Sequence, residues 1–594
     1  MTPRNPAVDQ RLKQVRGHIE HKRFSQAHAA LLALVRQRPA DSEVNRLLAE
    51  VCEELGQPAQ SFFYAQRAYD TAPGDPGAAL RLARSMAAVE GVPRAIEFLG
   101  GAVRAHPGQR DLRGELIMML LNSDRVVEAG RVCEEGLAQD PEADSIRAAY
   151  AMVLRKAGRL AEARAILREL QWRRPGDVFP VEYLSVLLLY DPDASGETIF
   201  SLHQQFGKLV DSYSADLGLS HPSTDDPDRL LRVGLLSPDF YTHSVSYFAE
   251  PILDGLDRAA FEVTCYHTGV RVDELSQRLR AKAARFRHLP MIDSPTLARR
   301  IHADRIDILI DLTGLYSGHR LHAMSIRPAP VQMTYIGYPA TTGIPNIDYR
   351  IVDSLTDPPG AERLATERLL RLDPCFLCYR PPDRAPDVRV AAREPGVPIT
   401  FGSFNSALKV NRRVIRVWGE IMNRVPGSRI LLKGLGLRQV EVRDEFAARF
   451  AAEGVEASRI ELVPQTEHWL EHLEMYGRVD VALDTFPYNG TTTTCEALFM
   501  GVPVVALEGT MHAGRVGLSL LSAVGLRELA AADEAGYVRM ATALAEDVER
   551  RRELRTTLRE RLLRSAVCDG AGFGARLGVL LRDAWRARCA GPTR

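Results

Sequence analysis

The stretch of the sequence with the clearest chemical potential is a run of four threonines, Thr491–Thr494, within DTFPYNGTTTTCEALFMGVPVV (484–505). The apolar run VDVALD before it predicts a strand, and TTTTCEALFMG predicts the start of a helix. The threonines are therefore expected in a strand-to-helix loop and in the first helical turn. Backbone N–H groups are unpaired there and the helix dipole is positive, which is the usual setting for a bound phosphate.

Hydroxyl and N–H donors would have to supply most of the binding at such a site. The helix dipole alone contributes about 0.3–1 kcal/mol at exposed positions. Threonine hydroxyls add donors without adding charge, and Glu496, one turn further on, can accept hydrogen bonds from ribose hydroxyls. The pattern favours a diphosphate nucleotide. The structural alternative is that one threonine caps the helix while the others pack or face solvent.

Composition limits the classes of partner. The 594 residues suffice for three or more domains, and Lys plus Arg equals Asp plus Glu at 76 each. With zero formal net charge, no field of one sign exists to hold a long nucleic acid. The eight cysteines are scattered, which indicates a reducing compartment. Because neither a signal-peptide core nor a membrane-length apolar stretch is found, we expect a cytoplasmic protein that binds no membrane.

The first third of the chain repeats with a constant period of 34 residues. Prolines recur at this spacing, and a small residue stands twelve positions before each: Ala27, Ser61, Ala95, Ala129 and Ala163 precede Pro39, Pro73, Pro107, Pro141 and Pro175. Small residues let two helices touch, and the proline follows the end of the second helix. The period resembles the tetratricopeptide repeat, with five units between 8 and 177. Such an array usually binds a protein segment on its concave face, the alternative being a scaffold that only dimerises or docks.

Beyond residue 190, short apolar runs alternate with helical stretches, which predicts parallel sheets covered by helices on both faces. The runs fall into two sets, so the expected fold class is an α-solenoid followed by an α/β unit of two Rossmann-like lobes, the GT-B fold. A two-lobed kinase-like or binding-protein fold is harder to separate from it on the pattern alone. The expected strands are 231–237, 261–267, 306–312, 330–337 and 349–353, then 399–405, 429–434, 460–464, 479–484 and 503–507.

The same pattern sets the expected domain boundaries. They are 1–190 for the repeat superhelix, 191–228 for a helical connector and polar linker, 229–385 for the first lobe, 396–545 for the second, donor-binding lobe and 546–594 for C-terminal helices. A break in the pattern at 381–398 separates the lobes. The last helix, FGARLGVLLRDAWRARC, is expected to cross back over the first lobe, with a membrane-surface helix as the alternative.

Several motifs resemble the SPINDLY and O-GlcNAc transferase family and are nearest to SPINDLY. They are the threonine segment, LSPDFYTHSVSYFAEPIL (236–253), RPAPVQMTYIGYPATTG (327–343), DSLTDPP (353–359), CFLCY (375–379) and FGSFNSALKVN (401–411). The resemblance covers essentially the whole chain, repeats included. It implies a metal-independent transferase without a cofactor, which moves a sugar from a nucleotide donor to Ser or Thr of proteins held by the repeats.

The resemblance also implies roles for single residues. Lys409 matches the lysine that contacts the donor diphosphate, where a fixed cation stabilises the departing charge. His243 matches a cleft histidine near donor and acceptor; histidine suits proton transfer, and its role as general base is left open. His472 matches a histidine that stacks near the donor base, with His468 as the alternative register.

In the donor loop, Thr491, Thr492 and Thr493 match the diphosphate-binding residues and Glu496 the ribose carboxylate. Thr491 follows the SPINDLY pattern, since O-GlcNAc transferases have histidine there, and this implies O-fucosylation from GDP-fucose. Arg515 departs from plant SPINDLY, which has asparagine. UDP-GlcNAc is the alternative donor, and another nucleotide sugar is a further possibility for the donor. The alternative class of protein is a scaffold whose transferase domain is inactive. The sequence leaves a homodimer open.

Cys375 and Cys378 form a CxxC pair in the CFLCY motif. No second pair and no histidine couple stands at zinc-binding spacing. Packing in the core is the favoured interpretation.

Overall fold

The computed structural model describes residues 6–214, 216–221, 226–389, 397–434, 436–466 and 468–590. Residues 222–225 of the predicted polar linker and 390–396 of the predicted break between the lobes lie outside these ranges. The chain divides into two compact units, Met1–Arg173 and Arg174–Arg594. The sequence places the end of the repeat region at 190, whereas the first unit ends at Arg173. The next helix, α11 (Val178–Leu188), packs against α12 (Gly196–Tyr213) within the second unit.

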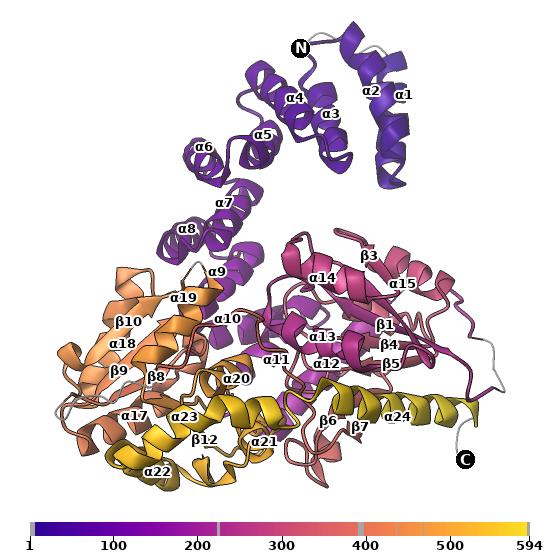
Figure 1. Ribbon diagram of the computed structural model, residues 1–594. Helices are drawn as coiled ribbons and strands as arrows, with labels where there is room; N and C mark the ends of the chain where they lie inside the picture. The colour runs from indigo at the N-terminus through magenta and orange to yellow at the C-terminus, as the bar shows by residue number, and fades with distance from the viewer. Residues whose placement is uncertain are drawn as a thin grey trace. The chain divides into compact units, whose positions relative to one another are not determined.

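The first unit consists of paired helices with the expected period (Figure 1). The five small residues predicted at the helix contacts are at most 1% exposed. Ser61, the polar member, donates its hydroxyl to Ala49 O at 2.9 Å, so its burial leaves no unpaired donor. The helices are α1 (Pro6–Glu20), α2 (Phe24–Gln37), α3 (Ser42–Glu54), α4 (Pro58–Thr71), α5 (Pro76–Val89), α6 (Val92–Ala105), α7 (Arg110–Asn122), α8 (Val126–Gln139), α9 (Asp144–Lys156) and α10 (Leu160–Arg173).

Each repeat proline lies two residues beyond the end of the second helix of its pair, as the sequence predicts. Pro39, for example, follows α2, which ends at Gln37, and Pro175 follows α10, which ends at Arg173. A proline at this position cannot continue the helix because it lacks the N–H and clashes with the preceding turn. The prediction of tetratricopeptide repeats is therefore confirmed.

The first lobe is built on a parallel sheet with the order β3-β2-β1-β4-β5-β6-β7 among the described residues. The central strands are buried on both faces, which explains their near-continuous apolar sequences. The elements of this lobe are β1 (Leu231–Ser237), α13 (Ser244–Gly255), β2 (Phe261–His267), α14 (Glu274–Lys282), β3 (Arg285–His288), α15 (Ser294–Ala303), β4 (Ile308–Asp311), α16 (Leu321–Ser325), β5 (Val331–Thr334), β6 (Tyr349–Val352) and β7 (Arg368–Arg371).

The second lobe repeats this plan, with a parallel sheet in the order β10-β9-β8-β11-β12-β13 over the described ranges. With the repeats, this arrangement confirms the predicted fold class. The elements are β8 (Thr400–Ser403), α17 (Arg412–Arg424), β9 (Arg429–Gly434), α18 (Val440–Ala452), β10 (Ile460–Pro464), α19 (Trp469–Glu474), β11 (Val481–Leu483), α20 (Thr492–Phe499), β12 (Val504–Leu507), α21 (Val516–Ala523), β13 (Ala530–Ala531), α22 (Glu534–Glu546), α23 (Val548–Arg564) and α24 (Gly570–Cys589).

The last helix, α24, returns to the first lobe and packs on α13 and β5, as expected from the sequence (Figure 1). Two glycines let the helices α13 and α24 touch. A Cβ at Gly574 would lie 2.0 Å from Gly255 O, closer than real contacts allow. At the far end, Arg582 Nη1 donates to the Pro227 and Arg229 carbonyls, both at 2.8 Å. This helix thus packs against the segment that leads into β1.

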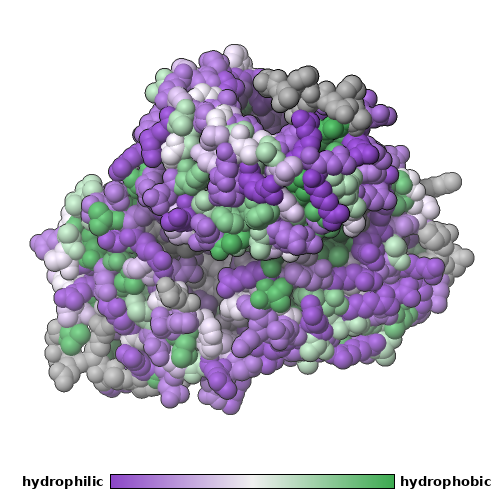
Figure 2. Space-filling model, turned by 90° about the horizontal axis from the view of Figure 1, so that it is seen from above, coloured by the Kyte–Doolittle hydropathy of each residue, from purple (hydrophilic) through white to green (hydrophobic). Residues whose placement is uncertain are grey.

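Hydrophilic residues predominate on the face shown in Figure 2, with hydrophobic residues in small scattered groups. Among the described residues, no helix combines the length and the apolar character that crossing a membrane requires.

The close approach at Gly574 predicts that Gly574→Ala destabilises the catalytic unit by about 1–3 kcal/mol, the usual cost of overpacking. Differential scanning calorimetry of the full chain measures the effect as a lowered midpoint. Gly570→Ala is the matched control on the same helix, because nothing lies within 4 Å of a Cβ there. Equal midpoints for the two variants would show that the contact is not tight.

Candidate functional site

A buried carboxylate, Asp484, organises the loop between β11 and α20. Its Oδ1 accepts hydrogen bonds from Gly490 N at 2.6 Å, Thr485 N at 2.8 Å and Asn405 Nδ2 at 3.1 Å. The side chain is 2% exposed. Because one oxygen bonds to both ends of the Thr485–Gly490 segment, the loop folds tightly over the end of the strand.

The threonines lie where the sequence predicts them. Thr491 precedes α20, and Thr492 and Thr493 are in its first turn, all three partly exposed. Among the described residues, the Thr491 side chain makes no capping hydrogen bond to α20, so the capping role considered for the threonines is not seen. Thr493 donates its hydroxyl to Asn405 Oδ1 at 3.0 Å. The first turn contains no acidic residue, and N–H groups at such a helix start suit a phosphate.

Lys409 reaches this loop from the second lobe's first strand-to-helix connection, the short helix η2 (Ala407–Lys409). Its Nζ donates to Asn489 O at 2.7 Å and lies 3.8 Å from the centre of the Tyr488 ring. Tyr488 and Asn489 precede the threonines, with Gly490 between Asn489 and Thr491. The structure therefore brings Lys409 and the predicted diphosphate loop together.

Burial shifts both ionisable groups of this corner toward neutrality. It lowers the pKa of Lys409 to about 8, although the Asp484 charge opposes the shift. Burial likewise raises the pKa of Asp484 to about 6, against the hydrogen bond from Gly490 and the charge of Lys409. At pH 7 both groups are charged, and a bound diphosphate would hold the proton on Lys409 more firmly.

Glu496 and His472 form a second corner of the site. His472 Nε2 lies 2.8 Å from Glu496 Oε2, and Tyr476 donates its hydroxyl to Thr493 O at 3.1 Å. The His472 ring centre is 5.8 Å from that of Phe404. His468, the alternative register, is exposed and precedes α19, so the structure brings His472 and not His468 to Glu496.

Lys433, at the end of β9, is a member of this corner that the sequence analysis missed. Its Nζ contacts His472 Nδ1, and the residue is 3% exposed. Burial lowers the pKa of Lys433 to about 8, with the Glu496 charge opposing. The available signal was a single lysine in the apolar run RILLKG (429–434), at the carboxyl end of a parallel strand where ligands bind.

His243 lies on the first lobe, where it precedes α13. Its Nδ1 accepts a hydrogen bond from Val245 N at 3.3 Å and is 3.9 Å from Asp239 Oδ2. Burial lowers the pKa of His243, which favours the neutral ring. A neutral ring that accepts at Nδ1 carries its proton on Nε2, so in this conformation Nε2 is a hydrogen-bond donor group and not an acceptor. It would act as a base only after a change of tautomer.

Contacts between the lobes join the loops that follow the carboxyl ends of the strands in the two sheets. The hydroxyls of Tyr316 and Tyr488 are 2.6 Å apart, and Ser519 donates to Asp353 Oδ2 at 2.6 Å. Arg515, the residue that departs from plant SPINDLY, donates through Nε to Leu355 O at 2.7 Å and through Nη1 to Glu508 at 2.7 Å. Its guanidinium therefore ties the lobes in this structure.

The CxxC pair is part of the core. Cys375 and Cys378 are at most 1% exposed, and Cys375 Sγ lies 3.4 Å from Ser519 Oγ. Over the described ranges, no group of three or more His, Cys, Asp or Glu side chains is arranged to hold a metal ion. The metal-independent reaction stays a prediction.

Comparison with known proteins places this geometry in a family. The profile of glycosyl transferase family 41 matches residues 216–378 and 387–577. Tetratricopeptide repeat profiles match 12–76 and 120–178.

Among relatives, a protein of Petunia hybrida named probable UDP-N-acetylglucosamine–peptide N-acetylglucosaminyltransferase SPINDLY is 41% identical over 410 residues, 68% of this chain and 44% of its own length. An Arabidopsis thaliana protein with the same enzyme name but the designation SEC is 32% identical over 307 residues, 50% of this chain and 31% of that protein. The chain thus matches less than half the length of these relatives. A solved structure of a mutant Thermobaculum terrenum O-GlcNAc transferase has a TM-score of 0.80 and 31% identity, and covers 87% of this chain and 98% of its own.

The lowered pKa of Lys409 predicts a pH dependence of nucleotide binding. The ammonium form is complete well below pH 8 and is lost as the pH rises through about 8, so the dissociation constant of a nucleoside diphosphate should rise about tenfold between pH 7 and pH 9. Calorimetric titration at each pH measures the rise. In Lys409→Arg, whose charge persists, most of it should vanish, whereas Lys433→Arg controls for the second lysine that titrates in this range. A rise that Lys409→Arg leaves unchanged would assign the titration elsewhere.

Proposed function

The chain belongs to glycosyl transferase family 41, and from this membership we propose that it transfers a sugar from a nucleotide donor to Ser or Thr side chains of proteins. The repeat unit would bind the acceptor protein, as such arrays commonly bind peptide segments. The catalytic unit would bind the donor on its second lobe. Because the eight cysteines are scattered along the sequence rather than spaced as a disulfide framework, we propose that the enzyme acts in the reducing cytoplasm.

One observation carries the proposal: Lys409 and the uncapped start of α20 meet at Asn489, in a loop that Asp484 holds. A donor diphosphate seated there would meet N–H groups, threonine hydroxyls and one cation. These groups are fixed before the reaction, and charge on the leaving phosphate grows as the sugar departs. They would therefore stabilise the transition state more than the ground state.

The residues of the second corner give the nucleoside its place in this proposal. Glu496 is held by His472 and would accept hydrogen bonds from the ribose hydroxyls. His472 and Phe404 would contact the base. His243, with its Nε2 proton, would donate a hydrogen bond to the sugar or to the acceptor.

We propose GDP-fucose as the donor. Thr491 follows the SPINDLY pattern, and the resemblance to SPINDLY implies transfer of fucose. UDP-GlcNAc is the competing donor, since the names of the relatives specify it. Calorimetric titration of the purified protein with both nucleotide sugars decides between them. Tighter binding of GDP-fucose is expected. Tighter binding of UDP-GlcNAc would overturn the donor assignment while retaining the site.

Lys409→Ala should abolish transfer and leave the fold intact, because Asp484, whose charge Lys409 partly offsets, keeps its hydrogen bonds from Gly490, Thr485 and Asn405. Transfer of labelled sugar to acceptor proteins in a lysate measures the loss, and the melting midpoint checks the fold. Wild-type turnover by the folded variant would remove Lys409 from the mechanism. Absence of transfer and of donor binding in the wild-type protein would favour a scaffold.

Thr492→Val should weaken donor binding, because valine keeps the shape of threonine and removes its hydroxyl donor. A loss of about 0.5–1.5 kcal/mol, which is two- to tenfold in the dissociation constant, is the usual value of one such hydrogen bond. Thr542→Val, on the surface of α22, is the matched control: its hydroxyl donates only to helix carbonyls. If Thr492→Val and the control bind the donor equally well, the threonine hydroxyl takes no part.

A further inference from the structure

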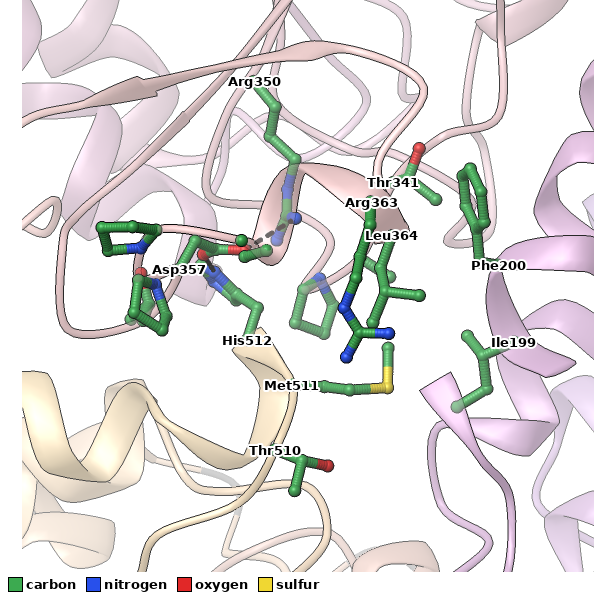
Figure 3. Close-up of a pocket in the computed structure, with 17 residues that line it drawn as sticks. Ile199, Phe200, Thr341, Arg350, Asp357, Arg363, Leu364, Thr510, Met511 and His512 are labelled. Carbon is green, nitrogen blue, oxygen red and sulfur yellow. Dashed lines mark hydrogen bonds and ion pairs between the residues drawn. The ribbon is translucent and has the colours of Figure 1, made fainter. Parts of the chain in front are cut away.

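The catalytic unit has a second cavity, which none of the candidate donor-site residues lines; parts of the motifs at 327–343 and 353–359 contribute to its wall. It has a volume of about 230 Å³ and lies where α12, the loops after β5 and β6 of the first lobe, and the loop after β12 of the second lobe meet (Figure 3). Arg350 and Asp357 come from the first lobe, and Met511 and His512 from the second. An occupant would therefore contact both lobes.

Three charged or titratable side chains form one wall of the cavity. Asp357 lies 3.5 Å from Arg350 Nη1 and 2.5 Å from His512 Nδ1 (Figure 3). Arg350, Asp357 and His512 are 4%, 5% and 7% exposed. Burial alone would raise the pKa of Asp357, but Arg350 and the hydrogen-bonded His512 hold it below its usual value, so the carboxylate is ionised; burial in turn lowers the pKa of His512. Its negative charge is already balanced by these two donors.

The arginine has binding capacity left over. Its Nη2 is buried and has no hydrogen-bond partner among the residues that the structure describes. Unpaired buried donors are rare because they lose their hydrogen bonds to water without a replacement. A guanidinium used only to neutralise Asp357 would be expected to bond through both of its outer nitrogens. Arg350 is one of the residues that line the cavity, so a molecule bound there is the natural source of an acceptor for its guanidinium.

The remaining walls are mostly apolar. Phe200 of α12, Leu364, Met511 and the prolines at 339, 358 and 359 line the space around the charged wall. At the rim, Arg363 adds a second guanidinium, which is paired with Glu197 at 2.6 Å. The cavity thus combines two arginines and a histidine with an apolar enclosure, which suits a molecule with an anionic head and a small apolar body.

We propose that this cavity binds a small organic anion, a carboxylate or a phosphate monoester, with its anionic oxygens on the Arg350 guanidinium and beside His512. Its apolar body would lie among Phe200, Leu364 and Met511. The site is distinct from the donor site, because Lys409, Glu496 and Thr491–Thr493 do not line it. It is nevertheless connected to the donor loop in space: the carbonyl of Ala513, next to His512, accepts a hydrogen bond from Asn489 N at 2.8 Å.

Fluorine NMR of the full chain with 4-fluorobenzoate and 4-fluorophenyl phosphate tests the proposal without any assay of transfer. At least one of the two probes should show saturable binding, and the one that binds identifies the head group. The neutral 4-fluorobenzyl alcohol should bind at least tenfold more weakly. Excess GDP or UDP should not displace the bound probe. Lack of binding by both anions, or complete displacement by a nucleotide, would overturn the proposal.

Two variants locate the probe. Met511→Trp should reduce binding at least tenfold by filling the cavity from its wall, without disturbing the charged residues. Arg350→Met should do the same by removing the guanidinium. If Arg350→Met lowers the melting midpoint, Met511→Trp alone decides. Arg424→Met, an exposed arginine on α17 paired with Glu420, is the control and should bind like the wild type. Binding equal to that of the wild type in Met511→Trp would place the probe elsewhere and overturn the assignment.

Discussion

The candidate site in the second lobe depends on one buried carboxylate. Asp484 stands at the end of β11 with three N–H donors on a single oxygen, and these bonds fix the path of the chain from the strand to α20. The same fold puts Asn489 O under the ammonium group of Lys409. A Cβ at Gly490 would lie 2.6 Å from the Thr493 hydroxyl, so the backbone can pass this close only as glycine. The position of the cation, the threonines and the helix start follows from that arrangement.

Long-period and apolar patterns in the sequence predicted most of the fold. The repeat register and the strands 231–237, 261–267, 429–434 and 460–464 agree with the structure to the residue, because buried parallel strands and helix contacts demand specific residue types. Three strands, β3, β7 and β13, were not predicted. β3 and β7 are short edge strands with arginines at their exposed positions, and β13 has two residues, so none has the apolar run that marks a central strand.

The parts of the candidate site that lie within one local motif were predicted, whereas contacts between residues far apart in the sequence were missed. The threonine loop could be placed because strand, turn and helix are adjacent in the sequence. Lys433 could not, since its partner His472 is 39 residues away and the contact depends on how β9 and α19 pack. The pair of Asp357 and His512 spans 155 residues and both lobes, which no local pattern reveals. His243 could be placed near the cleft, but its tautomer required the hydrogen bond from Val245.

The central claim is that the loop around Lys409 and the start of α20 is a seat for a diphosphate. Calorimetric comparison of GDP with GMP, and of UDP with UMP, tests it most directly. In the series that binds, the second phosphate should tighten binding at least about tenfold, or 1.4 kcal/mol, and Lys409→Ala should abolish most of that gain. Equal affinity for the monophosphate and the diphosphate in both series would contradict the account, because the affinity would then come from the base and ribose alone.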